Sequence, residues 1–144
     1  MQVTLDQDYS RYSIQAYRSG EVTVTIPLDQ AENVVPLHSD QPASRHEAIR
    51  ASVIILPDRL IRDWSAVSAA DLTPQDLAPL LDAKLEVILI GTGDRLIWPS
   101  QELRSHVAQA GIGLEIMDTG AACRTYNILM ADQRRVAAAL ILNP

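Results

Sequence analysis

The sequence contains no phenylalanine, one cysteine and three histidines among its 144 residues. A single cysteine, Cys123, excludes an internal disulfide bond and a metal site made of several cysteine ligands. The histidines, His38, His46 and His106, do not have the spacing of zinc-binding pairs on a helix. We therefore expect a core of Ile, Leu, Val and Ala, with neither a metal ion nor a cofactor.

The sequence also lacks long apolar segments and an excess of positive charge. No stretch approaches the roughly 20 apolar residues that span a bilayer, and the first residues do not resemble a signal peptide. A cytoplasmic protein without membrane insertion is therefore expected. The net charge of −6 argues against nucleic-acid binding, which needs a positive surface. Arginine outnumbers lysine 11 to one, a bias that suits phosphate or carboxylate binding but more commonly reflects a GC-rich genome.

Hydrophobic spacing predicts strands first and then alternating strands and helices. Segments 12–18 and 21–28 flank Ser19-Gly20 and predict a β-hairpin. Segment 33–38 predicts a short edge strand, since it contains Pro36, and segment 39–50 a loop or short helix. Further strands are predicted at 51–57, 85–90, 112–117 and 135–142, and helices at 100–110 and 119–131, with another helix that starts at Thr73-Pro74 and breaks at Pro79. This order indicates one α/β domain, 1–144, with a mainly parallel sheet and the hairpin as an extra layer or edge.

Glycine and polar residues follow three of the predicted strands. In open α/β sheets, ligands bind beyond the carboxyl ends of the strands. Here these ends are Pro57-Asp58, Gly91-Thr92-Gly93 and Asp118-Thr119. The topology therefore limits the candidate functional residues to those at these three strand ends.

The segment Gly91-Thr92-Gly93 is similar to the start of a dinucleotide-binding loop. It follows a strand, and Asp118 comes 25 residues after Gly93, near the spacing of a ribose-binding acid. However, Leu96 replaces the third glycine of G-x-G-x-x-G, and residues 94–99 delay the next helix. We therefore favour a tight turn, in which the glycines provide a positive φ or a close backbone approach.

The segment 115–129, EIMDTGAACRTYNIL, contains a second candidate feature. Asp118 or Thr119 can cap the predicted helix, whose partly positive N-terminus could hold an anion with help from Arg124. If Asp118 is the cap, it already occupies that position. Cys123 lies near this end, which could lower its pKa, but without a neighbouring histidine a buried apolar role is favoured. Asn127 faces either solvent or a neighbouring loop.

Several motifs occur in a fixed order: GTG after an apolar strand, a helix started by a proline, EIMDT, AACRTYNIL and RVAAALI. Together they resemble the small domain-of-unknown-function family that includes mitochondrial NADH dehydrogenase (complex I) assembly factor 3 and uncharacterised prokaryotic relatives. The resemblance is tight over 87–142 and looser before it. The family usually has Glu-Gly-Arg before the last strand, where this chain has Asp132-Gln133-Arg134.

The resemblance implies a three-layer α/β fold with a mixed, mainly parallel sheet whose last strand runs antiparallel. It implies no established enzymatic activity, and it implies a role exerted through contacts with other proteins. Our first hypothesis is therefore a non-catalytic protein-binding or complex-assembly function. Trp98 is either a contact anchor for a partner or a cover for the start of the following helix.

The second hypothesis is a small-molecule or anion-binding cleft, which could also be catalytic, where residues 91–94 meet residues 118–124. Asp118 could act there as a base. The simpler interpretation is that these residues connect two loops by hydrogen bonds and a buried Asp–Arg pair. The candidate binding residues are Gly91, Thr92, Gly93, Asp118, Thr119, Arg124 and Asn127. Neither the client protein nor the oligomeric state follows from the sequence.

Overall fold

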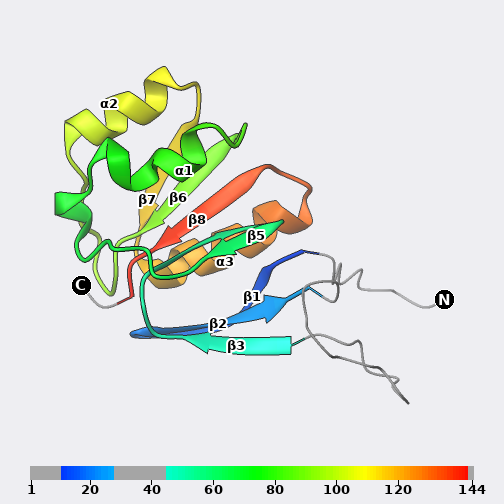
Figure 1. Cartoon of the computed structure of the whole chain (residues 1–144). Helices are drawn as coiled ribbons and strands as arrows, with labels where there is room; N and C mark the ends of the chain where they lie inside the picture. The colour runs from blue at the N-terminus through cyan, green and yellow to red at the C-terminus, as the bar shows by residue number, and fades with distance from the viewer. Residues whose placement is uncertain (1–10, 28–44, 143–144) are drawn as a thin grey trace, which may run out of the picture.

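A computed structural model describes residues 11–27 and 45–142, which form two β-sheets and the helices that cover them (Figure 1). The larger sheet contains β4 (Val53–Leu56), β5 (Arg59–Ile61), β6 (Val87–Gly91), β7 (Gly113–Met117) and β8 (Val136–Leu140), in the spatial order β5-β4-β8-β6-β7. β6, β7 and β8 are mutually parallel, whereas β4 pairs antiparallel with β5 and β8. The expected mixed α/β fold is therefore confirmed.

The direction of the last strand differs in part from the expectation. β8 is antiparallel to β4 but parallel to β6, so β4, and not β8, is the strand that runs against β6 and β7. The cause is the crossover helix α3 (Thr119–Ala131), which follows β7 and returns the chain to the edge at which β7 began. A strand that follows such a crossover enters the sheet in the parallel direction.

The smaller sheet is antiparallel and consists of β1 (Ser13–Arg18), β2 (Glu21–Ile26) and β3 (Arg45–Ile49). β1 and β2 confirm the predicted hairpin. β3 replaces the loop or short helix expected at that point. Its sequence, RHEAI, is mostly polar and exposed, so pairing along the edge of β2 makes it a strand, which local hydrophobicity does not reveal. The strand expected at 33–38 lies outside the described residues.

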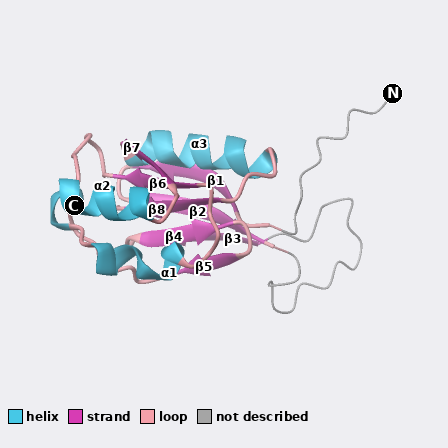
Figure 2. Cartoon of the chain, turned by 90° about the horizontal axis from the view of Figure 1, so that it is seen from above, coloured by secondary structure: helices cyan, strands magenta, loops and turns pink. Residues whose placement is uncertain are grey.

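The larger sheet is covered on both faces, which confirms the three layers (Figures 1 and 2). One face packs against α1 (Ala78–Leu81), α2 (Gln101–Gln109) and the short 3-10 helices η2 (Ala69–Asp71) and η3 (Pro74–Leu77). The other packs against α3 and the smaller sheet, side by side. Along β8, Val136, Ala138 and Leu140 face this second layer, and alternate residues face the first, as the two-residue period of a strand requires.

Local sequence explains the helix starts. Pro79 was expected to interrupt the helix that begins after Thr73, and the structure has η3 followed directly by α1, with Pro79 in the first turn of α1. Proline is tolerated there because the first turn has no intrahelical partner for its missing N–H. Ser100 caps α2 by accepting from the Leu103 N–H at 3.2 Å.

The two longer helices end in the same hydrogen-bonded motif. After α2, the Gly111 and Ile112 N–H groups donate to the Ala108 and Val107 carbonyls. After α3, the Gln133 and Arg134 N–H groups donate to Met130 and Leu129 in the same pattern. Both ends are Schellman motifs, which place one residue in the left-handed region. That residue is Gly111 (φ 77°) after α2 and Gln133 (φ 64°) after α3, so the chain keeps the turn without the usual glycine.

This pair of helix ends yields a reciprocal prediction. Gln133→Gly should stabilise the protein by about 1 kcal/mol, because a side chain in the left-handed region is strained and glycine is not. Gly111→Gln should destabilise it by a similar amount, although space around Gly111 is open. Thermal unfolding should show shifts of about 3 °C in opposite directions. Equal midpoints for the wild type and Gln133→Gly would contradict this account of the turn.

Candidate functional site

The loops after β6, β7 and β8 meet at one edge of the larger sheet. Gly91, the last residue of β6, lies opposite Met117 of β7 and Leu140 of β8. Backbone bonds continue the pairing beyond the strands, from the Thr92 N–H to the Met117 carbonyl and from the Ile141 N–H to the Gly91 carbonyl, both at 2.9 Å. The expectation that Gly91-Thr92-Gly93 and Asp118-Thr119 lie together is therefore confirmed.

Pro57-Asp58 does not belong to this group. β4 runs antiparallel to β8, so its carboxyl end lies at the opposite edge of the sheet. The sequence-based grouping treated β4 as a strand that a helical crossover follows, which would make it parallel to the next strand. Instead, β4 turns directly into the antiparallel strand β5. The end of β8 takes its place at this edge, which the register of Gly91 against Leu140 shows.

The hydroxyl group of Thr119 joins two of these loops. It accepts a hydrogen bond from the Gly93 N–H and donates one to the Ile141 carbonyl, both at 2.8 Å. The Thr119 N–H also donates to the Gly93 carbonyl at 2.9 Å. Thr119 is fully buried. Removal of its hydroxyl group would therefore leave the Gly93 N–H and the Ile141 carbonyl without a hydrogen-bond partner and without access to water.

The two glycines have different roles. A Cβ atom on Gly91 would lie 2.9 Å from the Thr119 Cα atom, so Gly91 permits the close approach of α3 to β6. Gly93 has a φ of 102°, which a residue with a side chain adopts only under strain. The predicted tight turn is confirmed in both respects.

The loop between β6 and α2 is held by hydrogen bonds within the loop and by hydrogen bonds from the hairpin. The hydroxyl of Thr92, fully buried, donates to the Arg95 carbonyl and accepts from the Ile97 N–H. The Asp94 carboxylate accepts from the Ser19 hydroxyl at 2.7 Å and from the Tyr17 hydroxyl at 3.4 Å. Burial and the adjacent carboxylate raise the pKa of Tyr17 to about 12, so this phenol remains a hydrogen-bond donor at neutral pH.

The N-terminus of α3 is capped by its own sequence. The Asp118 Oδ1 atom accepts from the Ala121 N–H at 2.8 Å, which satisfies one of the free amides there. Gly120 lies against the ring of Tyr17, since a Cβ atom added at Gly120 would be 3.3 Å from it. Arg124 is exposed, and no Asp118–Arg124 ion pair forms among residues 11–27 and 45–142. The buried Asp–Arg pair of the simpler interpretation is therefore not present.

Asn127 faces strand β1 of the hairpin, whereas solvent or a neighbouring loop was expected. Its Oδ1 atom accepts from the Ile14 N–H at 2.9 Å, and its Nδ2 atom donates to the Ile14 carbonyl at 2.6 Å. The Tyr126 hydroxyl donates to the Tyr12 carbonyl at 2.8 Å. α3 therefore binds the outer edge of β1 through side chains, much as a neighbouring strand would bind it through its backbone.

Cys123 is a core residue. It is 3% exposed and packs in the cluster between α3 and the two sheets. Burial raises the pKa of its thiol to about 12, so the thiolate that a nucleophile needs is absent at neutral pH. The predicted apolar role is confirmed.

The seven candidate residues therefore separate into four environments. Gly91, Thr92, Gly93 and Thr119 form a buried junction, Asp118 caps α3, and Asn127 binds β1, while Arg124 is exposed. Sequence reasoning missed Asp94 as a link to the hairpin and Ile141 as the acceptor for Thr119. Only the spatial position of the hairpin reveals the first of these. The second involves a backbone carbonyl, which no side chain in the local sequence marks.

Apolar side chains are exposed on the surface next to this junction. Leu96 is 52% exposed and Trp98 is 59% exposed. The Arg104 guanidinium lies over the Trp98 ring, 5.7 Å from its centroid, a cation–π distance. Trp98 therefore contacts the first part of α2 through Arg104 but leaves more than half of its own surface exposed.

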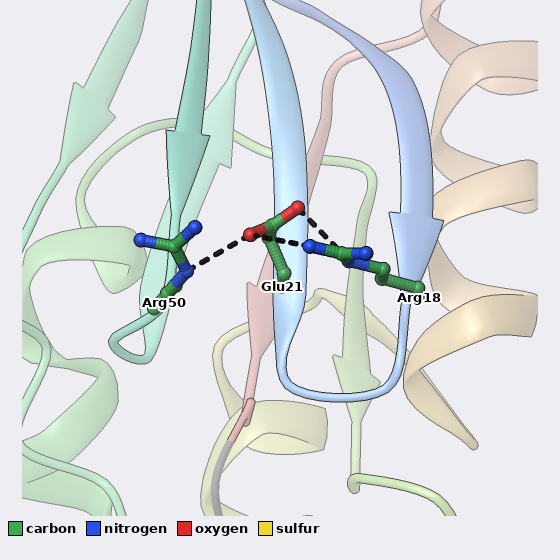
Figure 3. Close-up of polar contacts among 3 residues, drawn as sticks. All are labelled: Arg18, Glu21 and Arg50. Atoms are coloured by element: carbon green, nitrogen blue, oxygen red, sulfur yellow. Dashed lines mark hydrogen bonds and ion pairs between the residues drawn. The ribbon is translucent and has the colours of Figure 1, made fainter.

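Charged residues on the smaller sheet form a surface cluster (Figure 3). Glu21 lies between Arg18 and Arg50, with the Arg18 Nε atom 3.1 Å and the Arg50 Nε atom 2.9 Å from its carboxylate oxygens. These hydrogen bonds lower the pKa of Glu21. Both arginines are about three-quarters exposed, and such surface pairs contribute little to stability. The cluster links the hairpin turn to the end of β3.

Comparisons with known proteins identify related sequences and folds. Residues 40–141 match the family model described as a protein of unknown function (DUF498/DUF598). NADH dehydrogenase (ubiquinone) 1 alpha subcomplex assembly factor 3 of Homo sapiens is 33% identical over 129 residues, which cover 83% of this chain and 68% of the human protein. A crystal structure of a Bordetella parapertussis protein has a TM-score of 0.72 and 30% identity, and covers 93% of this chain and 98% of its own.

A second structural relative identifies the fold type. A Bordetella pertussis protein described as a Mth938-like domain has a TM-score of 0.68 and 26% identity. The match covers 99% of this chain and 93% of that one. Within the described residues of the present chain, no helix is long and apolar enough to cross a membrane.

The buried junction yields a direct test. Thr119→Val keeps the shape of the side chain but leaves the Gly93 N–H and the Ile141 carbonyl unpaired, so it should cost about 3 kcal/mol in the free energy of unfolding. The matched variant Thr119→Ser keeps the hydroxyl and should cost about 1 kcal/mol, the effect of one methyl group. Urea denaturation measures both values. Equal losses for the two variants would show that the hydroxyl does not hold the loops together.

Proposed function

Because the chain belongs to the DUF498/DUF598 family of proteins of unknown function and is similar to complex I assembly factor 3, we propose that it is a non-catalytic assembly-type protein that binds other proteins. The similarity to a curated assembly factor over 83% of this chain carries the proposal. The client of this chain need not be the one that the mitochondrial protein serves. That the chain is not an enzyme and that it is cytoplasmic both stay predictions.

The loop after β6 is the surface that we assign to partner binding. It presents Leu96 and Trp98, both more than half exposed. Among the residues that the structure describes, Val67 and Ile128 are the other large apolar side chains with such exposure, and they lie apart from this loop in the sequence. Tryptophan and arginine are enriched among the residues that dominate binding energies at interfaces, and Arg104 is already stacked on Trp98.

The base of this loop is rigid, which favours binding. Thr92 closes the loop internally, and Asp94 fastens it to Ser19 of the hairpin. A loop held in one conformation loses less entropy when a partner binds it. The buried junction therefore supports the binding surface and does not itself contact the partner.

The alternative function, a small-molecule or anion cleft at residues 91–94 and 118–124, has weaker support. Thr92 and Thr119 are fully buried and use their hydroxyl groups within the protein. Asp118 occupies the helix N-terminus that an anion would need. A ligand there would have to break existing hydrogen bonds before it formed new ones.

The proposed surface predicts a selective loss of binding. Trp98→Ala should reduce recovery of a native partner at least about tenfold, since truncation of an interface hot spot commonly costs 2 kcal/mol or more. The matched control is Val67→Ala, because Val67 is also exposed, at 64%, but lies on the segment before η2. Both variants and the wild type are used as bait in lysates of the native cells, with partners quantified by mass spectrometry.

Two outcomes would contradict the proposal. The first is that the wild-type protein recovers no partner reproducibly, which would argue against protein binding altogether. The second is that Trp98→Ala recovers the same partner as well as Val67→Ala does, which would reject this surface. Partner recovery with Arg124→Ala, an exposed residue near the α3 N-terminus, then tests whether binding uses the neighbouring helix instead.

A further inference from the structure

A pocket opens at the edge of the larger sheet opposite to the buried junction. It has a volume of about 570 Å³, within the range of small-molecule sites. The β4–β5 turn, the segment between α1 and β6, and the connection from α3 to β8 form its walls. Arg11, just before β1, completes the lining. Elements from four parts of the sequence therefore converge on this space.

The charge of the pocket is opposite to that of the whole chain. Four arginines line it, Arg11, Arg59, Arg134 and Arg135, against two acids, Asp58 and Asp82. This local excess of positive side chains occurs in a protein whose net charge is −6. The pocket contains four of the chain's 11 arginines. Glu86, which does not line the pocket, offsets part of the charge of Arg134 and Arg135.

The arginines are held by the protein but keep donors for a ligand. Arg59 Nη2 donates to the Pro79 carbonyl at 3.0 Å, and Arg135 Nε donates to the Lys84 carbonyl at 2.7 Å. Arg134 Nε contacts the Glu86 carboxylate at 2.6 Å. A guanidinium has five N–H donors, so each of these contacts orients the planar group and leaves further N–H groups available.

The floor of the pocket is apolar. Leu56, at the end of β4, and Leu85, before β6, are buried core residues that also line it. Pro57 and Pro79 add apolar surface at the walls. The pocket thus combines an apolar base with arginine side chains, the composition that suits a ligand with an apolar body and a charged group.

We propose that this pocket binds a small organic anion whose carboxylate or phosphate group is held by Arg59, Arg134 and Arg135, and whose apolar part rests on Leu56 and Leu85. Guanidinium groups match both kinds of anion through paired hydrogen bonds. The site is separate from the loop after β6, so it can be correct whether or not that loop binds a partner. It also differs from the sequence-predicted cleft, which lies at the other edge of the sheet.

The test is a two-dimensional ¹H–¹⁵N NMR titration of the full chain with phenyl phosphate, benzoate, inorganic phosphate and acetate. Phenyl phosphate and benzoate should shift the amide signals of Asp58, Ala83 and Gln133 in a saturable way. They should bind more tightly than inorganic phosphate and acetate, because only they can contact the apolar floor. The stronger of the two then identifies phosphate or carboxylate as the preferred group.

Variants make the assignment specific. Arg59→Gln and Arg134→Gln should each weaken binding at least about tenfold, the effect of one lost charge-assisted hydrogen bond. The matched control Arg45→Gln, at an exposed arginine of β3 that also pairs with a glutamate, should bind like the wild type. Arg59 and Arg134 are both exposed, so their substitution should leave the fold intact. The amide spectrum of each variant shows directly whether it is folded.

Three results would overturn the proposal. One is the absence of saturable shifts up to about 10 mM, which exceeds the dissociation constants of weak ligands. Another is that shifts occur at Gly93 and Gly120, which would place the anion at the opposite edge. The third is equal binding by the wild type, Arg59→Gln and Arg134→Gln, which would show that the anions associate with surface charge in general.

Discussion

The hydroxyl group of Thr119 is the interaction on which the rest of the structure depends. It connects the end of β6 to the end of β8, through the Gly93 N–H and the Ile141 carbonyl, and it is fully buried. The close approach that this requires is available only because Gly91 has no side chain. Three parallel strand ends, which in many α/β proteins surround a ligand, are here joined to each other.

This closed junction determines where function can be located. The polar groups that a ligand would use at that edge are already paired with each other. A binding function near the junction therefore has to use the exposed surface around it. Asp94 and Asn127 extend the same network to the hairpin, which makes the smaller sheet part of a continuous structure with α3. The loop with Trp98 stands on this support, and the arginine-lined pocket lies at the other edge, where β4 reverses the strand direction.

Much of this fold was accessible from the sequence, for identifiable reasons. α3 begins and ends as predicted because Asp118, the small residues after it and the apolar spacing through Met130 all favour one helix. β8 runs antiparallel to β4, as the family resemblance implied, but the crossover through α3 makes it parallel to β6. β3 was not predictable, since RHEAI becomes a strand only through pairing with β2. Nor was the pocket, because its four arginines come from distant segments. Glu86, which contacts Arg134, is likewise distant from it in sequence.

Native-state hydrogen exchange at the Gly93 amide tests the central claim most directly. If Thr119 closes the junction, this amide should exchange only through global unfolding, with the same opening free energy as the central-strand amides of Leu89 and Ala138. The neighbouring Thr92 amide, which donates to the Met117 carbonyl, should also exchange only through global unfolding. Exchange at Gly93 that is orders of magnitude faster than in the central strands would show that the loops open independently. The edge would then be a dynamic cleft, and the account of a closed structural junction would be wrong.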